Sequence, residues 1–350
     1  MIILAIDTSC DDTSAAVVKD KIVLSNVISS QTELHNTWGG VVPIIAKRAH
    51  QERIDAVISK ALQLAKVSIQ SIEVVAVTYG PGLAIALEVG VKKGKELALQ
   101  LRKPLIAVNH MEGHLYSVFA QTKGKKLAKP QFPVLALLVS GKHTELVFMK
   151  EHGEYKILGA TLDDAVGEAF DKVARLLGLG YPGGAILSLI AKRGNPNAYS
   201  FTVPLHRRKD LDFSYSGIKA AMVRLVKQIT MDEKRSLTRK EISDLSASFQ
   251  KVAIQHLVER TKRALQMVKV KSLIVGGGVS ANLVLRNELR KICRSNNIPL
   301  FVPSKKILCM DNAAMIGVAA WYKAQRKEFV EDVTKLERDP IASIDVYIMK

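Results

Sequence analysis

The chain has 350 residues, of which 48% are hydrophobic, and this length predicts two domains or one large two-lobed globular unit. No apolar run is long enough to span a membrane, and the N-terminal residues lack the basic start and cleavage site of a signal peptide, which argues against membrane and secreted proteins. Three cysteines without CxxC spacing suit a reducing compartment, so we expect a cytoplasmic protein.

The charge balance is strongly basic, with 51 Lys and Arg against 33 Asp and Glu, a net charge of +18. Such an excess favours a polyanionic partner, nucleic acid first, although a generally basic proteome is the plainer explanation. Aromatic residues make up only 5% of the chain, which disfavours a base-stacking platform for single strands. Contacts to the phosphates of a shaped RNA fit this composition better.

Apolar periodicity and turn residues predict the same order of elements, β-β-β-α-β-α-β-α, in two successive parts of the chain. In the first part we expect strands at residues 2–6, 15–18, 22–28, 74–78 and 105–108, and helices at 43–66, at 84–102 and after the last strand. In the second part we expect strands at 134–139, 145–149, 155–158, 272–275 and 300–302, and helices at 166–177, 241–268, 281–294 and 311–324.

This doubling is typical of the α/β class that includes actin, Hsp70 and the sugar kinases (the ASKHA fold), in which two lobes enclose a nucleotide in a central cleft. A Lys-rich stretch at 121–131 without apolar periodicity indicates the boundary. We expect a first lobe at 1–125, a second lobe at 126–330 with a helical insertion at about 180–240, and a C-terminal tail at 331–350.

A candidate metal site begins at His110-Met111-Glu112-Gly113-His114, directly after a predicted buried strand. On a helix, His110 and His114 lie on one face and can share a metal ion, although such pairs are often ordinary surface or core residues. The motif is not that of the zinc proteases, which requires Glu directly after the first His. The predicted symmetry of the lobes makes Asp311 the natural third ligand; helix capping is its plain alternative role.

Three turns carry groups suited to a nucleotide or phosphate. They are residues 8–13, with the two acids Asp11 and Asp12, residues 138–144, and residues 276–282. The glycines of the last turn satisfy a dinucleotide fingerprint, but no acid ends the next strand. Asp171 follows Glu168 by one helical turn and can reach a ribose hydroxyl, and the basic residues of 206–240 form the best candidate for RNA docking, with a solvated surface as the alternative.

With these residues in place, the chain resembles the bacterial-type TsaD family of tRNA N6-adenosine threonylcarbamoyltransferases from residue 2 to about 324. The resembling motifs are DTSCDDT (7–13), GGVVP (39–43), GPGL (80–83), NHMEGH (109–114), LVSG-x-HTEL (138–146), DDAVGEAFDKVARLLGL-x-YPGG (163–184), DFSYSGIK (212–219), GGGVSAN (276–282) and MDNAAMIG (310–317). The chain departs from the family pattern at three positions: it has Lys142 in the 140–142 turn, where the family usually has two glycines, Ile44 where an acid is usual, and Ile85 where a small residue is usual.

The resemblance implies an enzyme that moves the threonylcarbamoyl group from threonylcarbamoyl-AMP to N6 of adenosine 37 in tRNA. It implies one metal ion, iron or zinc, on His110, His114 and Asp311. The residues it implies for adenylate binding are Leu138, Val139, Ser140, Gly141, Lys142, Asp171, Gly184 and Asn282. From position, Asp12 is our first candidate for the acceptor of the N6 proton, and Asp11 is the second.

The resemblance also implies a small TsaB-like paralogue and a TsaE-like ATPase as partners. Two alternatives remain open, a non-catalytic scaffold of the same complex and a carbamoyltransferase or kinase of the same fold. A degenerate ligand set would mark the scaffold, and a kinase should lack the two histidines and the aspartate together. A protease fits the residues least, because the histidine pair lacks the adjacent Glu.

Overall fold

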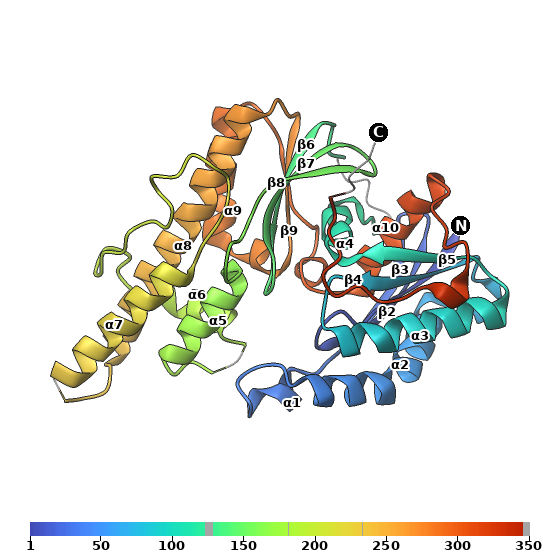
Figure 1. The fold of residues 1–350 in the computed structure, drawn as a ribbon, viewed down its shortest axis with the longest axis horizontal. Coiled ribbons are helices and arrows are strands. Elements are labelled where there is room, and N and C mark those ends of the chain that lie inside the picture. Colours follow the sequence, from blue (N-terminus) through green and yellow to red (C-terminus); the bar gives the residue numbers. More distant parts are fainter. Residues whose placement is uncertain (123–128, 181, 233, 346–350) are drawn as a thin grey trace. The chain divides into compact units, whose positions relative to one another are not determined.

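The protein is described by a computed structural model that covers residues 1–350 except 123–128, 181, 233 and 346–350. It forms two compact units (Figure 1). The first comprises residues 1–131, 149–156 and 301–350, and the second comprises 132–148 and 157–300. None of the helices in these described ranges combines the length and apolar character that crossing a membrane requires.

There are two five-stranded sheets with the same strand order; the first lies in the first unit, and the second lies in the second unit except for residues 149–151, 154–156 and 301. The strands of the first sheet are β1 (Ile2–Asp7), β2 (Asp12–Lys19), β3 (Ile22–Ser30), β4 (Val74–Gly80) and β5 (Leu105–Asn109). Those of the second are β6 (Val134–Val139), β7 (Thr144–Glu151), β8 (Glu154–Ala160), β9 (Ser272–Gly276) and β10 (Leu300–Phe301). The orders β3-β2-β1-β4-β5 and β8-β7-β6-β9-β10 are equivalent, which confirms the predicted duplication.

Within the first sheet, β1 pairs antiparallel with β2 and parallel with β4, and β5 continues the parallel part. The parallel strands therefore end on the same side, and β5 delivers the chain directly to the first histidine. Strand β1 is buried on both faces, as expected for the centre of a sheet that helices cover on both sides.

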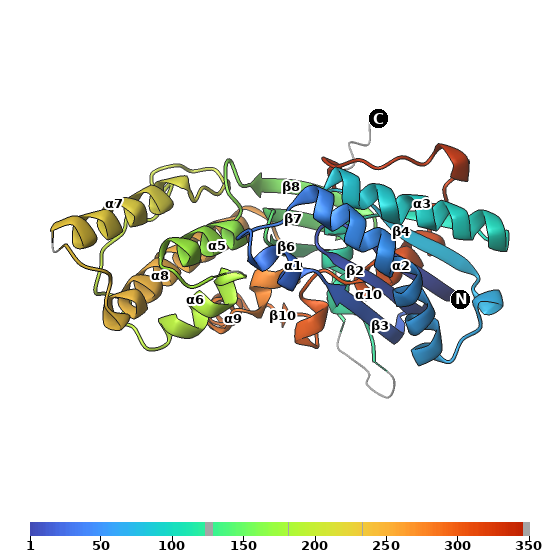
Figure 2. The ribbon, with the colours of Figure 1, turned by 90° about the horizontal axis from the view of Figure 1, so that it is seen from below.

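The helices of the first unit lie on both faces of its sheet (Figure 2). They are α1 (Thr32–Asn36), α2 (Pro43–Ala65), α3 (Ala84–Leu101), α4 (His110–Tyr116) and α10 (Ala313–Gln325). Leu4, Ile6 and Val17 pack in the core with α2 and α3, while α10 contacts β1 and β2. Gly317 brings α10 close to the sheet, because a Cβ on it would lie 2.6 Å from Val18 Cγ2.

The helices of the second unit are α5 (Val166–Leu176), α6 (Gly183–Ala191), α7 (Ser216–Asp232), α8 (Arg239–Met267) and α9 (Leu283–Ser295). Helix α8 packs against α6, α7 and α9, and it contacts β6. Helices α6 and α7 occupy much of the stretch in which the sequence predicts a helical insertion.

The C-terminal part of the chain lies elsewhere than the sequence led us to expect. The sequence analysis predicts the last helix, which is α10, in the second lobe, but residues 301–350 belong to the first unit. Residues 313–320 of α10 are all buried, so this helix fills the face of the first sheet opposite α2 and α3. The expected boundary between residues 125 and 126 lies outside the described ranges.

Candidate metal centre

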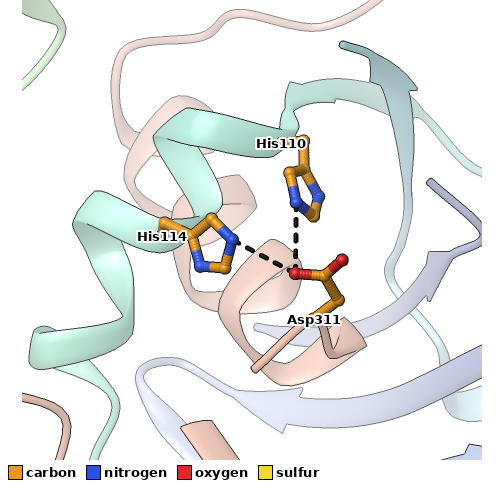
Figure 3. Close-up of side chains that lie close together, drawn as sticks. All are labelled: His110, His114 and Asp311. Atoms are coloured by element: carbon orange, nitrogen blue, oxygen red, sulfur yellow. Dashed lines mark ion pairs between the residues drawn. The ribbon is translucent and has the colours of Figure 1, made fainter. Parts of the chain in front are cut away.

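The two histidines of the candidate site stand on a short helix that is fixed at its start. Asn109, the last residue of β5, caps α4 by accepting hydrogen bonds from the backbone N–H groups of Met111 and Glu112. His110 and His114 are 4% and 0% exposed, and their ring centroids are 4.7 Å apart. The predicted placement of both imidazoles on one helix face is therefore confirmed (Figure 3).

Asp311 comes from the residues just before α10 and points at both histidines (Figure 3). Its Oδ1 lies 3.4 Å from His110 Nε2 and 3.2 Å from His114 Nε2. The alternative role as N-cap of this helix is wrong, because Asn312 accepts the capping hydrogen bond from the Met315 N–H. The Asp311 carboxylate is therefore available to a ligand, and it belongs to the same unit as the histidines rather than to the second lobe.

The three side chains fit a metal ion. One ligand atom from each lies within 4.8 Å of the others. Two ligands at about 2.1 Å from a tetrahedral ion are about 3.4 Å apart, close to the observed N···O separations. His114 is fully buried, and neither of its ring nitrogens makes a hydrogen bond within the described part of the chain. Buried polar atoms without hydrogen bonds are rare in proteins, and an ion would satisfy this ring.

The electrostatics of the cluster favour the forms that bind a metal. Burial lowers the pKa of His114, and the neighbouring His110 lowers it further, against the opposing effect of Asp311. Burial alone would raise the pKa of Asp311, but the two histidines hold it well below its usual range. Neutral imidazole and ionised carboxylate are the metal-binding states of these groups.

Gly113 allows the two ligand-bearing segments to approach. A Cβ at this position would lie 2.8 Å from Ile316 Cδ1 and 3.2 Å from Met315 Cγ, both on α10. A larger residue would require these two side chains to shift or α4 to move away from the helix that follows Asp311. The glycine in the middle of the motif therefore has a packing reason.

The acidic turn after β1 lies in the same unit. Asp7 Oδ2 is 3.8 Å from His110 Nδ1, on the opposite ring edge from Asp311. Burial raises the pKa of Asp12 to about 7, and the negative charges of Asp11, Asp311 and Asp7 raise it further, while a hydrogen bond with Ser30 opposes them. The Asp12 carboxyl is thus poised to change protonation near neutral pH.

This turn is fixed by residues outside it that the sequence analysis did not single out. Thr8 Oγ1 donates to the Ala86 carbonyl of α3, and a Cβ on Gly90 would collide with the same hydroxyl. The buried His50 of α2 bonds Thr13 Oγ1 through Nδ1 at 2.8 Å and the Cys10 carbonyl through Nε2 at 3.0 Å. Asp7 was detectable as an acid directly after a buried strand, whereas His50, 37 residues from Thr13, left no local signal.

The residues predicted to bind the adenylate lie in the second unit, where glycines bring three segments together. Ser140 Oγ accepts from the His143 N–H within its own turn, and the Ser140 carbonyl accepts from the Gly167 N–H at the start of α5. A Cβ on Gly277, whose φ is +87°, would lie 2.3 Å from the Val139 carbonyl oxygen. The turn at 138–142, the start of α5 and the turn at 276–278 are therefore in contact, with Gly141 and Lys142 exposed.

The remaining three of these residues are engaged in local hydrogen bonds. Asp171 Oδ1 accepts from the Gly184 N–H at 2.7 Å, which joins α5 to α6. Asn282 caps α9 and donates to Ser188 Oγ and Gln250 Oε1. Leu138 and Val139 are fully buried in β6. Tyr181, part of the matching motif, lies outside the described residues.

Comparison with solved structures identifies the class of fold. The chain superposes on (R)-2-hydroxyglutaryl-CoA dehydratase component A from Acidaminococcus fermentans with a TM-score of 0.53 and 13% identity, covering 93% of this chain and 99% of that one. It superposes on HypF from T. kodakarensis with a TM-score of 0.57 and 14% identity, covering 96% of this chain and 49% of HypF. These likenesses, with the duplicated sheets, place the protein in the ASKHA fold class.

Sequence comparison identifies the family. Residues 22–318 match TsaD, described as tRNA N6-adenosine threonylcarbamoyltransferase. Proteins of that name from Clostridium kluyveri and Trichlorobacter lovleyi are 46% and 49% identical to this chain. The matches cover 93% of this chain and 93% of the first protein, and 91% and 90% for the second. The chain belongs to the TsaD family.

Proposed function

We propose that this protein transfers the threonylcarbamoyl group from threonylcarbamoyl-AMP to N6 of adenosine 37 in tRNA. The observation that carries the proposal is the convergence of His110, His114 and Asp311 in a chain of this family. A non-catalytic scaffold would be expected to have lost one or more of these ligands, whereas this chain has all three. An ASKHA-fold kinase or carbamoyltransferase is disfavoured by the same triad and by the family match.

The first unit supplies the metal centre. His110, His114 and Asp311 would hold the metal ion, iron or zinc, because two imidazole nitrogens and a carboxylate oxygen are ligands that both metals accept. A bound ion supplies a Lewis acid that stabilises charge developing on the threonylcarbamoyl group. The Asp7 carboxylate, 3.8 Å from His110 Nδ1, adds a negative charge beside the second ring nitrogen of this residue.

Asp12 is the proposed acceptor of the N6 proton, with Asp11 as the second candidate. The N6 amine attacks the carbonyl carbon, a C–N bond forms, the C–O bond to the phosphate breaks, and AMP leaves. The amine proton passes to Asp12, whose pKa near 7 suits a general base at neutral pH. Full activity of Asp12→Asn would contradict this assignment.

The second unit supplies the adenylate-binding residues. The backbone of the 138–142 turn suits the phosphate, Asp171 and Gly184 suit the ribose side, and Asn282 borders the same cluster. Four of the basic residues in the stretch 206–240 form ion pairs with nearby acids, namely Arg208, Lys219, Arg235 and Lys240. The exposed Arg207 and Lys209 are therefore our first candidates for contact with tRNA phosphates. A TsaB-like paralogue and a TsaE-like ATPase are the proposed partners, in the cytoplasm.

A transfer assay tests the proposal. The purified protein, alone and with the proposed partners, receives threonylcarbamoyl-AMP and unmodified tRNA, beside a His110→Ala/His114→Ala variant. We expect modified adenosine with the native protein and none with the variant. Failure of every partner combination, despite a bound metal, would favour the scaffold, and Lys142→Gly would then test whether the unusual lysine blocks the turn.

A further inference from the structure

The face of α4 opposite the two histidines carries a buried network of charges. At 100° per residue, Glu112 lies about 160° around the helix from both His110 and His114. Its side chain is 5% exposed and therefore faces the interior on the other side from the metal ligands. This carboxylate is buried near the candidate metal centre but does not contact it. Because burying a charge without partners is costly, its burial needs a structural explanation.

Glu112 is held by partners from two other segments. Tyr155, in the described stretch 149–156 of the first unit, donates its hydroxyl to Glu112 Oε1 at 2.8 Å. Arg326 Nη2 lies 3.4 Å from the same oxygen, and Lys323 Nζ lies 3.7 Å from Oε2. The Tyr116 hydroxyl, one turn further along α4, lies 3.1 Å from the Tyr155 hydroxyl and accepts a hydrogen bond from Arg326.

Two of these partners belong to the end of α10. Lys323 lies in the last turn of that helix and Arg326 is its C-cap residue, whereas Asp311 directly precedes the N-cap residue Asn312. The proposed ligand Asp311 therefore lies next to one end of α10, and the partners of Glu112 lie at the other end. Between these two ends of α10, Gly113 of α4 packs against Met315 and Ile316, so the two helices also contact each other there.

Helix α4 cannot hold its own geometry. It has seven residues, and isolated helices of that length are not stable in water. The directions of the two imidazoles are therefore set by contacts outside the helix. On the face of α4 opposite the histidines, Glu112 and Tyr116 make those contacts. A shift of this face would rotate both histidines relative to Asp311.

We propose that Glu112 is a positioning residue for the metal centre. It joins the face of α4 opposite the histidines to the end of α10, and so fixes His110 and His114 relative to Asp311. The proposal rests on the metal centre described under the proposed function. Glu112 does not touch the ion or the substrate, and it acts through the helix that carries the ligands.

Glu328 provides a matched control. It pairs with the same two cations, at 2.7 Å from Lys323 Nζ and in contact with Arg326 Nε, but its side chain is 39% exposed, and among the described residues it has no hydrogen bond or ion pair with α4. Replacing Glu112 or Glu328 by Gln removes one negative charge from the same four-residue charge cluster. Only the first change alters the ion pairs between α4 and the end of α10.

The test measures metal affinity in full-length protein freed of metal. Co²⁺ is titrated by its visible absorption, and Zn²⁺ affinity is measured by competition with a chelator. We expect Glu112→Gln to weaken binding about 10- to 100-fold and to change the Co²⁺ spectrum, as loss of an outer-shell partner does. Glu328→Gln should stay within about threefold of the native protein, which is the scatter expected for an exposed pair.

The outcomes separate the possible failures. A purely structural role would lower the urea midpoint of the metal-free Glu112→Gln protein while leaving Co²⁺ affinity and spectrum unchanged, and this would overturn the proposal. If Glu112→Gln does not fold, Tyr155→Phe carries the test, with an expected loss of about fivefold for one hydrogen bond; native affinity in that variant would count equally against it. Unchanged Co²⁺ binding by His110→Ala/His114→Ala would instead contradict the metal centre itself.

Discussion

The candidate metal centre of the first unit and the proposed adenylate-binding residues of the second unit differ in how their polar groups are used. In the first, the buried His114 ring makes no hydrogen bond among the described residues, and three ligand atoms converge. In the second, Asn282 caps a helix and Asp171 binds the Gly184 N–H. The candidate metal centre thus keeps a buried ring whose nitrogens have no hydrogen bond among the described residues, whereas Asn282 and Asp171 are used to hold their unit together.

The largest effect should follow from separating ligation from helix capping at the start of α10. Asp311→Asn removes the charged ligand, so we expect at least 100-fold weaker metal binding and loss of transfer activity. Asn312→Ala removes the cap and should cost about 1 kcal/mol of stability. Calorimetric metal titration and urea unfolding of both variants check this, and equal metal affinity in the two would contradict the assignment.

The acidic turn provides a pH-dependent comparison. The pKa of Asp12 is raised in the folded protein, so between about pH 4 and 7 the folded state binds more protons than the unfolded state, and this group makes stability fall as pH rises through that range. The shift of about three units sets a ceiling of about 4 kcal/mol, and partial solvent contact reduces it.

Asp12→Asn removes that penalty. Unfolding of metal-free protein at pH 8 should show the variant about 1–3 kcal/mol more stable than the native chain, with the difference vanishing below pH 4. Transfer activity should fall in the same variant, because the proton acceptor is lost. A variant that is less stable at pH 8 would show that the carboxyl is not destabilised by burial.

Two glycines compare packing in the two regions. Gly113→Ala places a methyl group 2.8 Å from Ile316 Cδ1, so we expect a loss of about 1–3 kcal/mol and weaker metal binding. Gly141→Ala, in the exposed turn of the second unit, meets no atom within 4 Å and should change stability by less than about 0.5 kcal/mol. Thermal unfolding of the pair measures the contrast, which equal losses would remove.

The sequence predicted the fold, and it also predicted that His110, His114 and Asp311 come together, for identifiable reasons. Strand order followed from the doubled pattern, and His110 and His114 are four residues apart on one helix, which spacing alone reveals. The sequence did not reveal that α10 packs on the first sheet or that Asn312 is the N-cap of α10, because both depend on packing of residues distant in the chain. The network of Glu112 with Tyr155 and Arg326 was missed for the same reason, since 43 or more residues separate the partners.

Asn282 shows how the comparison can be sharpened where a residue has two roles. Asn282→Ala should cost about 1–2 kcal/mol, because it removes the cap of α9 and the bonds to Ser188 and Gln250, and any loss of adenylate affinity would then be ambiguous. Asn282→Asp retains the capping oxygen for the Val284 and Leu285 N–H groups but removes the amide donor. If Asn282 contacts the adenylate through that donor, urea unfolding should place the Asp variant closer to the native protein than the Ala variant, while equilibrium binding of threonylcarbamoyl-AMP falls in both. Native affinity in the Asp variant would assign Asn282 a structural role alone, and the second unit would then bind its ligand mainly through the backbone of the glycine turns.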